Sequence, residues 1–246
     1  MNETDCTACA VKNETNETAE KNEEKVFAVA IDGPASAGKS TVAKELASLF
    51  GLIHVDTGAM FRAIGLKALR LGIDPADEAA VEPMLEDTVV TIEHVDSAQH
   101  IFLDGEDVNG FIRTEEVSQA ASTISTLPPV REKLLELQRE LAKTQSLVMD
   151  GRDICTVVLP DARFKFYVTA SAEVRAQRRY KEYEQKDKLN GMSFEDILRE
   201  IEERDYRDMN REYAPLRPAE DAVYIDTSEL SIKQVLTKVL LSMIDI

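Results

Sequence analysis

The residues with the clearest chemistry lie in a glycine-rich segment at 33–40. They match the pattern G-x-x-x-x-G-K-[ST], whose glycines let the backbone wrap a phosphate chain with its N–H groups pointing inward. Lys39 is expected to reach the β- and γ-phosphates of a nucleoside triphosphate, with ATP as the default donor, and the Ser40 hydroxyl is expected to bind Mg²⁺. The residues predicted to cradle the donor are Gly33, Pro34, Ala35, Ser36, Ala37, Gly38, Lys39, Ser40 and Thr41.

A carboxylate that supports the metal is expected at the end of a strand next to this segment. Asp150 follows the apolar run 147–149, and a side chain just past a buried strand would meet the phosphate loop at the carboxyl edge of a parallel sheet. We therefore predict that Asp150 holds Mg²⁺ through a water molecule. A turn or helix-capping role for Asp150 is the alternative.

The arginines indicate what accepts the phosphoryl group. The three histidines are scattered, with no spacing typical of a metal site or a catalytic triad. A monophosphate acceptor is already anionic, so the protein must overcome the repulsion of two polyanions, and planar guanidinium groups grip phosphate oxygens in pairs. The candidates are Arg62, Arg131, Arg152, Arg175, Arg178, Arg179, Arg204, Arg207 and Arg211. The dense set between 175 and 211 predicts a mobile lid that closes over both phosphates and excludes water.

The elements that must position these residues alternate between buried strands and amphipathic helices. Apolar runs predict strands at 26–31, 52–55, 146–150, 164–169 and 222–225. Helical spacing predicts helices at 39–50, 59–71, 114–125, 129–143, 172–185, 193–208 and from 231 onward. The fold class is therefore α/β, with a five-stranded parallel sheet between two layers of helices.

Three segments depart from this alternation. Residues 1–25 are polar and predict a disordered acidic tail ahead of a domain that spans 26–246. Weak alternation and the turn at Asp104-Gly105 predict a small antiparallel excursion at about 84–115. The predicted lid spans about 178–212.

Composition limits the partners. The net charge of −17 over 246 residues argues against a protein that coats nucleic acid. Apolar runs are too short to span a membrane, and no signal-like start is present, which together predict a cytoplasmic protein. Cys6 and Cys9 lack the companions of a zinc site. Without an evident apolar face or heptad pattern, we expect a monomer.

Several segments together resemble the bacterial cytidylate kinases, in the nucleoside monophosphate kinase branch of the P-loop fold. They are IDGPASAGKST at 31–41, DTGAMFR at 56–62, GFIR at 110–113, DGRD at 150–153, and RDYRDMNR at 204–211 followed by APL at 214–216. The resemblance covers about 26–240. It implies transfer of the γ-phosphoryl group of ATP to CMP or dCMP, and it makes the excursion an acceptor-binding insertion.

The resemblance also implies roles for individual residues. On the acceptor side, Thr57 and Arg62 would hold the acceptor and its phosphate, Asp208 would bind the ribose, and the residues that would recognise cytosine are Ser122, Arg131 and Asp153. The residues that would contact the phosphates and the transferred group are Arg152, Arg204 and Arg211, and those that would cover the donor are Arg175 and Arg179. Met209 stands where some relatives carry arginine. This departure leaves open the full charge of the lid.

The base preference has a physical reason. The exocyclic amine of cytosine donates to a carboxylate such as that of Asp153, whereas uracil would set a carbonyl oxygen against it. We therefore expect CMP to be strongly preferred over UMP. Two other interpretations remain open: a P-loop kinase for another small acceptor, such as UMP or a shikimate-type hydroxyl compound, and a nucleotide-hydrolysing switch.

Overall fold

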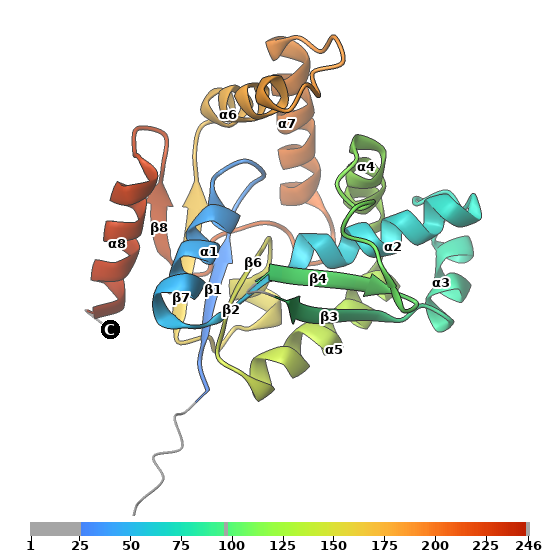
Figure 1. Ribbon diagram of the computed structural model, residues 1–246, viewed down its shortest axis with the longest axis horizontal. Helices are drawn as coiled ribbons and strands as arrows, with labels where there is room; N and C mark the ends of the chain where they lie inside the picture. The colour runs from blue at the N-terminus through green and yellow to red at the C-terminus, as the bar shows by residue number, and fades with distance from the viewer. Residues whose placement is uncertain (1–25, 96–97, 245–246) are drawn as a thin grey trace, which may run out of the picture.

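A computed structural model of the protein describes residues 26–95 and 98–244, and its centre is a parallel β-sheet (Figure 1). Within the described residues, five strands lie in the order β2-β6-β1-β7-β8, with every neighbouring pair parallel. Their bounds are β1 Ala28–Asp32, β2 Ile53–Asp56, β6 Leu147–Gly151, β7 Phe164–Thr169 and β8 Val223–Asp226. The predicted α/β class and five-stranded sheet are confirmed. The tail predicted at 1–25 lies outside the described residues.

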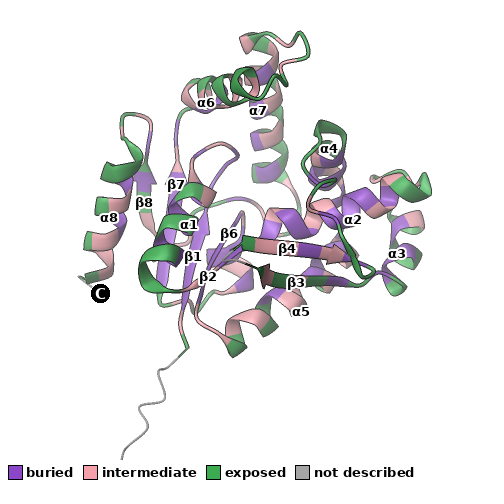
Figure 2. Ribbon diagram, in the orientation of Figure 1, coloured by how far each residue is buried: buried purple, intermediate pink, exposed green. Residues whose placement is uncertain are grey.

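The central strands are buried on both faces, which explains their continuous apolar sequence (Figure 2). Successive side chains of β1 point to opposite faces, so Val29 and Ile31 pack in one core cluster and Ala28 and Ala30 in another. On the first face lie α1, Lys39–Phe50, and α8, Ile232–Ile244. On the second lie α5, Pro128–Thr144, and a π-helical turn, η1, Ile154–Val158. The result is the expected sandwich of three layers.

The register of the sheet brings separate segments to one edge. Asp32, the last residue of β1, pairs with Gly151 of β6, while Asp56, the last residue of β2, pairs with Asp150. The carboxyl ends of these three strands therefore meet where the glycine-rich loop leads from β1 into α1. This is the edge at which parallel sheets of this kind bind ligands.

A second unit packs beside this edge around its own apolar core. It contains α2 Thr57–Leu71, α3 Glu78–Glu86, α4 Glu115–Ile124, and an antiparallel sheet of β3 Val90–Val95, β4 Ala98–Leu103 and β5 Glu106–Asp107. The antiparallel sheet lies within the excursion expected at 84–115. The sequence reasoning missed α3, which contains Pro83. Asp77, whose side chain caps this helix, was the available signal.

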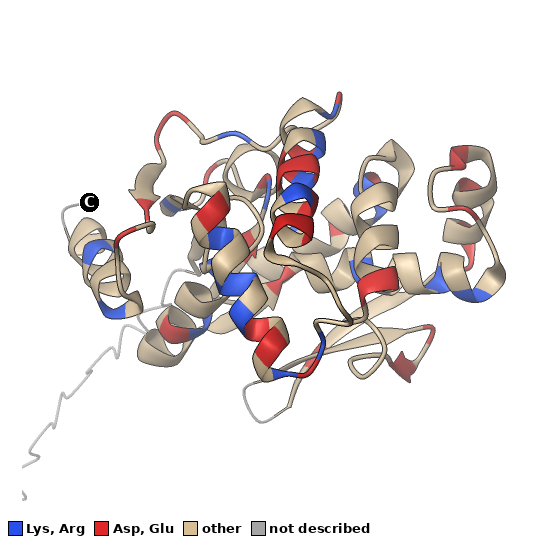
Figure 3. Cartoon of the chain, turned by 90° about the horizontal axis from the view of Figure 1, so that it is seen from above, with Lys and Arg blue, Asp and Glu red and all other residues tan. Residues whose placement is uncertain are grey.

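Two charged helices stand above the sheet (Figure 1). They are α6, Ala172–Gln185, and α7, Phe194–Asn210, joined by a small apolar cluster of Ala176, Ile197 and Ile201. Ser193 and Asp196 form a capping box that starts α7. Seen from above, basic and acidic residues are interspersed along the helices of the chain (Figure 3). Among the described residues, no helix has the length and apolar character needed to cross a membrane.

The glycine-rich loop depends on a close approach at Gly33. This residue has φ +145°, and a Cβ placed there would lie 1.9 Å from the carbonyl oxygen of Val168 in β7. Both the dihedral angle and the missing side chain are therefore required.

Replacing Gly33 with alanine should destabilise the fold, because β1 and β7 must separate to admit the methyl group. We expect Gly33→Ala to lower the free energy of unfolding by about 3 kcal/mol or more. Urea denaturation measures this. Gly110→Ala is the control, because a Cβ at Gly110 meets no atom within 4 Å. If both variants unfold at the urea concentration of the wild type, the close approach at Gly33 does not contribute to the free energy of unfolding.

Candidate active site

The carboxyl edge of the sheet opens into a cavity of about 1190 Å³ beneath the two charged helices. It is larger than the 300–1,000 Å³ that pockets for a single small molecule commonly measure. The predicted residues that line it are Ala35, Ser36, Gly38, Lys39, Ser40, Thr41, Thr57, Arg62, Ser122, Arg131, Asp150, Arg152, Asp153, Arg179, Arg204, Asp208 and Arg211. Gly33, Pro34, Ala37 and Arg175 do not line it.

The glycine-rich loop presents Lys39 to the cavity. Gly38, with φ 94°, ends the loop where α1 begins, and Lys39 is the first residue of that helix. The Lys39 ammonium donates to the carbonyl oxygen of Pro34 at 2.7 Å. Burial, reinforced by the nearby charge of Arg152, lowers the pKa of Lys39 to about 7. An anion bound in the loop would remove this penalty.

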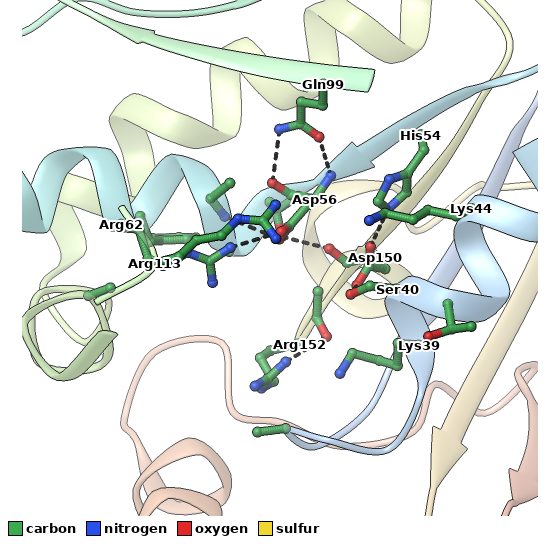
Figure 4. A pocket seen from close by; sticks show the side chains of 18 of the residues that line it. Lys39, Ser40, Lys44, His54, Asp56, Arg62, Gln99, Arg113, Asp150 and Arg152 are labelled. Carbon is green, nitrogen blue, oxygen red and sulfur yellow. Dashed lines mark hydrogen bonds and ion pairs between the residues drawn. The ribbon is translucent and has the colours of Figure 1, made fainter. Parts of the chain in front are cut away.

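Asp150 joins two segments at the floor of the cavity (Figure 4). The Ser40 hydroxyl donates to one carboxylate oxygen at 2.8 Å, and Nε2 of His54 lies 2.7 Å from the other. The Thr57 hydroxyl donates to the Asp150 carbonyl oxygen at 2.9 Å. The sequence assigned no role to His54, because the three histidines are scattered along the chain, but it belongs to this network.

The oxygen donors around Asp150 suit a hard cation. Among the described residues, no group of three or more His, Cys, Asp or Glu side chains could hold a metal by itself. Ser40 and Asp150 could supply the protein side of a Mg²⁺ site, since Mg²⁺ commonly keeps its waters and takes further ligands from substrate phosphates. This fits the residues predicted for the metal.

The start of α2 presents Arg62. Asp56 caps this helix by accepting from the N–H of Ala59 at 3.1 Å, and its other oxygen accepts from Arg62 at 2.8 Å. Burial is the largest single influence on Asp56 and opposes its ionisation, but the charge of Arg62, together with other nearby positive charges and the N–H of Ala59, outweighs burial and lowers the pKa of Asp56. The side-chain amide of Gln99 bonds both the N–H and the C=O of Asp56, at 2.6 and 3.2 Å. Neither Asp56 nor Gln99 was expected at the site.

A second cluster of polar side chains faces the cavity from α4, α5 and the segment after β6. Arg131 forms a buried ion pair with Asp153, and Nη2 of Arg211 lies 3.4 Å from the second oxygen of Asp153. The Ser122 hydroxyl and Nε of Arg131 are buried and have no hydrogen-bond partner among the described residues. Because buried polar atoms are nearly always satisfied, these groups indicate a polar ligand.

Three further arginines, Arg152, Arg204 and Arg211, bring positive charge into the same cavity. Arg152 donates through Nε to Asp208 at 2.9 Å, so the acid expected at the ribose is engaged by an arginine. Nε of Arg204 has no partner in the described part of the chain, and burial with the charge of Arg152 lowers the pKa of Arg204 to about 10. Burial also lowers the pKa of Arg211 to about 10, aided by Arg131. These buried like charges repel one another, and phosphate groups would relieve the repulsion.

Arg175 does not line the cavity, although it contacts the glycine-rich loop. It is 4% exposed, and its guanidinium pairs with Asp205 at 2.5 Å and donates to the Ala170 carbonyl oxygen at 2.9 Å. The pair with Asp205 ties α6 to α7, and Nη1 of Arg175 also donates to the carbonyl oxygen of Ala35 in the glycine-rich loop at 3.4 Å. Arg179, four residues on, does line the cavity and contacts Ser36 through Nε at 3.2 Å. Arg178 is a further lining residue.

Comparisons with known proteins show what the chain is similar to. Residues 29–244 match the family model described as cytidylate kinase. A cytidylate kinase from Caldicellulosiruptor bescii is 52% identical over 216 residues, covering 88% of this chain and 95% of that protein. One from Bacillus pumilus is 45% identical over 216 residues, with the same coverage. A solved structure of an uncharacterized protein from Eubacterium ventriosum has a TM-score of 0.50 at 11% identity, covering 89% of this chain and 99% of that one, and shows the fold alone.

The buried charge of Lys39 predicts opposite effects on stability and activity. Lys39→Met should raise the free energy of unfolding of the free protein by a few kcal/mol at pH 7, because it removes a desolvated ammonium group. The same change should lower phosphoryl transfer about a thousandfold, as expected for losing a group that stabilises developing charge. Thermal unfolding without nucleotide and a coupled ADP assay measure the two effects.

The gain in stability should depend on pH. Lys39 has a folded pKa of about 7 against an ordinary value of 10.5, so between these values the unfolded chain binds the extra proton and the wild type gains stability as pH rises. The advantage of Lys39→Met should therefore be largest below pH 7 and vanish toward pH 10. Lys233→Met, on the exposed face of α8, is the control. An advantage independent of pH would contradict the assigned cause.

Proposed function

The chain belongs to the cytidylate kinase family, and on that premise we propose that it transfers the γ-phosphoryl group of ATP to CMP or dCMP, releasing ADP and CDP or dCDP. One observation carries the proposal for this chain. Lys39, Arg152, Arg204 and Arg211 converge on one cavity beside the unpartnered Ser122 hydroxyl, among the described residues. The cavity thus combines a phosphate-binding centre with a site for a polar base.

The donor lies in the glycine-rich loop, with its phosphates along the N–H groups at the start of α1. Lys39 leaves the carbonyl oxygen of Pro34 and contacts the β- and γ-phosphates. Arg179 reaches the same loop from α6, where it contacts Ser36. Both arginines predicted to cover the donor contact this loop. Arg179 lines the cavity, whereas Arg175 donates to the carbonyl oxygen of Ala35 from a buried position against Asp205.

Ser40 and Asp150 would hold Mg²⁺, with Asp150 acting through a water molecule. When bound, the ion neutralises charge on the donor phosphates. Asp150 is oriented for this role by hydrogen bonds with Ser40 and His54, and its backbone is held by Thr57. Thr57 therefore acts here through the position of Asp150, in addition to lining the acceptor side of the cavity.

Arginines bring the acceptor phosphate into line. Arg62 approaches from α2 and Arg152 from the end of β6, while Arg204 and Arg211 approach from α7 and its C-terminal boundary. An oxygen of the acceptor phosphate attacks the γ-phosphorus, the bond to the β-phosphate oxygen breaks, and these guanidinium groups stabilise the shared charge. The nucleophile is already ionised, so no general base is required.

Asp153 selects the base. Its carboxylate accepts from the exocyclic amine of cytosine, while the Ser122 hydroxyl and the unpartnered Nε of Arg131 are the adjacent polar groups of the described cavity. Asp208 holds Arg152 and lies at the same wall, where we place the ribose. Closure of α6 and α7 as a lid, a monomeric state and a cytoplasmic location remain predictions.

A panel of acceptors tests the reaction and the base preference together. We expect rapid ADP release from ATP and Mg²⁺ with CMP and dCMP, and little with UMP, AMP, shikimate or no acceptor. An unmatched buried polar group should disfavour UMP by about 10⁴ in kcat/KM. Asp153→Asn should reduce this preference strongly, because an amide can donate to the uracil carbonyl.

The other outcomes of the panel identify the competing functions. Equal ADP release with and without an acceptor would indicate a nucleotide-hydrolysing switch. Fast turnover of shikimate would indicate a hydroxyl acceptor. Equal turnover of CMP and UMP by the wild type would remove Asp153 from its assigned role.

A further inference from the structure

Asp32 is a buried carboxylate that the reaction described above does not use. It ends β1, directly before Gly33, and its exposed fraction is 0%. It does not line the cavity. Its two oxygens accept hydrogen bonds from the backbone N–H groups of Ile154, at 2.8 Å, and Cys155, at 2.7 Å.

Those two N–H groups belong to the first turn of η1, where backbone donors lack partners within the helix. Asp153 stands immediately before this turn, at the position where an aspartate commonly accepts from such donors itself. Its side chain makes no capping bond and instead contacts Arg131 and Arg211 at the cavity. Asp32 thus supplies the cap from a neighbouring strand.

The short segment between β6 and η1 is consequently held at both ends. On one side, Gly151 pairs with Asp32 in the sheet register. On the other, the Asp32 side chain holds Ile154 and Cys155. Between these anchors lie the two residues that face the cavity, Arg152 and Asp153.

We propose that Asp32 is a positioning residue for acceptor selection: by capping η1 in place of Asp153, it leaves the Asp153 carboxylate free to recognise the acceptor base. The proposal rests on the function proposed above and assigns a structural cause to its base preference. Without the remote cap, Asp153 is the nearest carboxylate to the vacant donors and turns toward them.

The buried surroundings of Asp32 disfavour its charged form. Burial raises the pKa of Asp32 to about 6, while the N–H groups of Cys155 and Ile154 oppose the rise and Asp153 adds to it. The negative charge of Asp32 also acts on two neighbours: it raises the pKa of Tyr167, and it opposes the lowering of the pKa of Lys39. The geometry of the two N–H bonds, which uses both oxygens, explains why a carboxylate suits this position better than an amide.

The test compares wild type with Asp32→Asn, which retains one acceptor oxygen but sets an NH₂ group against the other N–H. We expect kcat/KM for CMP to fall about tenfold or more and that for UMP to stay nearly constant, so that the CMP preference falls by the same factor. Binding of a non-hydrolysable ATP analogue, measured by calorimetry, should change less than about threefold. Asp77→Asn, an exposed carboxylate that caps its own helix α3, is the control and should leave all three values unchanged.

A double variant separates positioning from general structural damage. If Asp32 acts through Asp153, adding Asp32→Asn to Asp153→Asn should change the CMP-to-UMP ratio little further, because coupled residues are not additive. Equal loss of kcat/KM for both acceptors, or additive effects on their ratio, would overturn the proposal. Should Asp32→Asn fail to fold, Asp32→Ser, which retains one hydroxyl acceptor, takes its place in the same assays.

Failure of the proposed function is recognised separately. A wild-type enzyme that does not prefer CMP has no base preference for Asp32 to support, and this result appears before any variant is measured. A wild type that prefers CMP, with Asp32→Asn retaining the full preference, contradicts the role of Asp32 alone.

Discussion

The constraint on which the rest of the structure depends is positive charge confined to a buried cavity. The chain carries a net charge of −17, yet Lys39, Arg152, Arg204 and Arg211 face one another at the carboxyl edge of the sheet. Burial and mutual repulsion lower the pKa values of Lys39, Arg204 and Arg211. Polyphosphate substrates are the partners that make such an arrangement favourable, so the free protein is organised around ligands that supply the missing negative charge.

Acidic residues near the cavity form ion pairs with several of these arginines in the free protein. Asp208 holds Arg152, Asp153 lies between Arg131 and Arg211, and Asp56 holds Arg62. These pairs orient each guanidinium and reduce the cost of its burial, although a buried pair need not stabilise the fold overall. In contrast, Asp205 pairs with Arg175 and so joins α6 to α7. Similar charges thus serve substrate binding or helix packing according to their partners.

The parallel sheet supplies the rigid reference for these groups. Strands β1, β2 and β6 end at the same edge of the sheet. The sheet therefore fixes the relative positions of three segments that reach the cavity: the loop after β1, the start of α2 and the segment after β6. Gly33 allows the first to pass close to β7, Asp150 connects β6 to α1, and Gln99 fastens the small antiparallel sheet to the end of β2. A small displacement of any one strand would therefore move these cavity-lining segments relative to one another.

The sequence alone determined the features that depend on near neighbours: the glycine-rich loop at 33–40 between a strand and a helix, the parallel strands and most helices. Hydrophobic periodicity and glycine positions act over a few residues, so they can be read without the fold. The sequence failed where remote contacts decide. His54 meets Asp150 across 96 residues, and Asp32 caps η1 across 122. Arg175 and Arg179 carry the same charge on the same helix, yet only the tertiary structure separates a buried ion pair from a cavity-lining group, because the partner Asp205 belongs to a different helix.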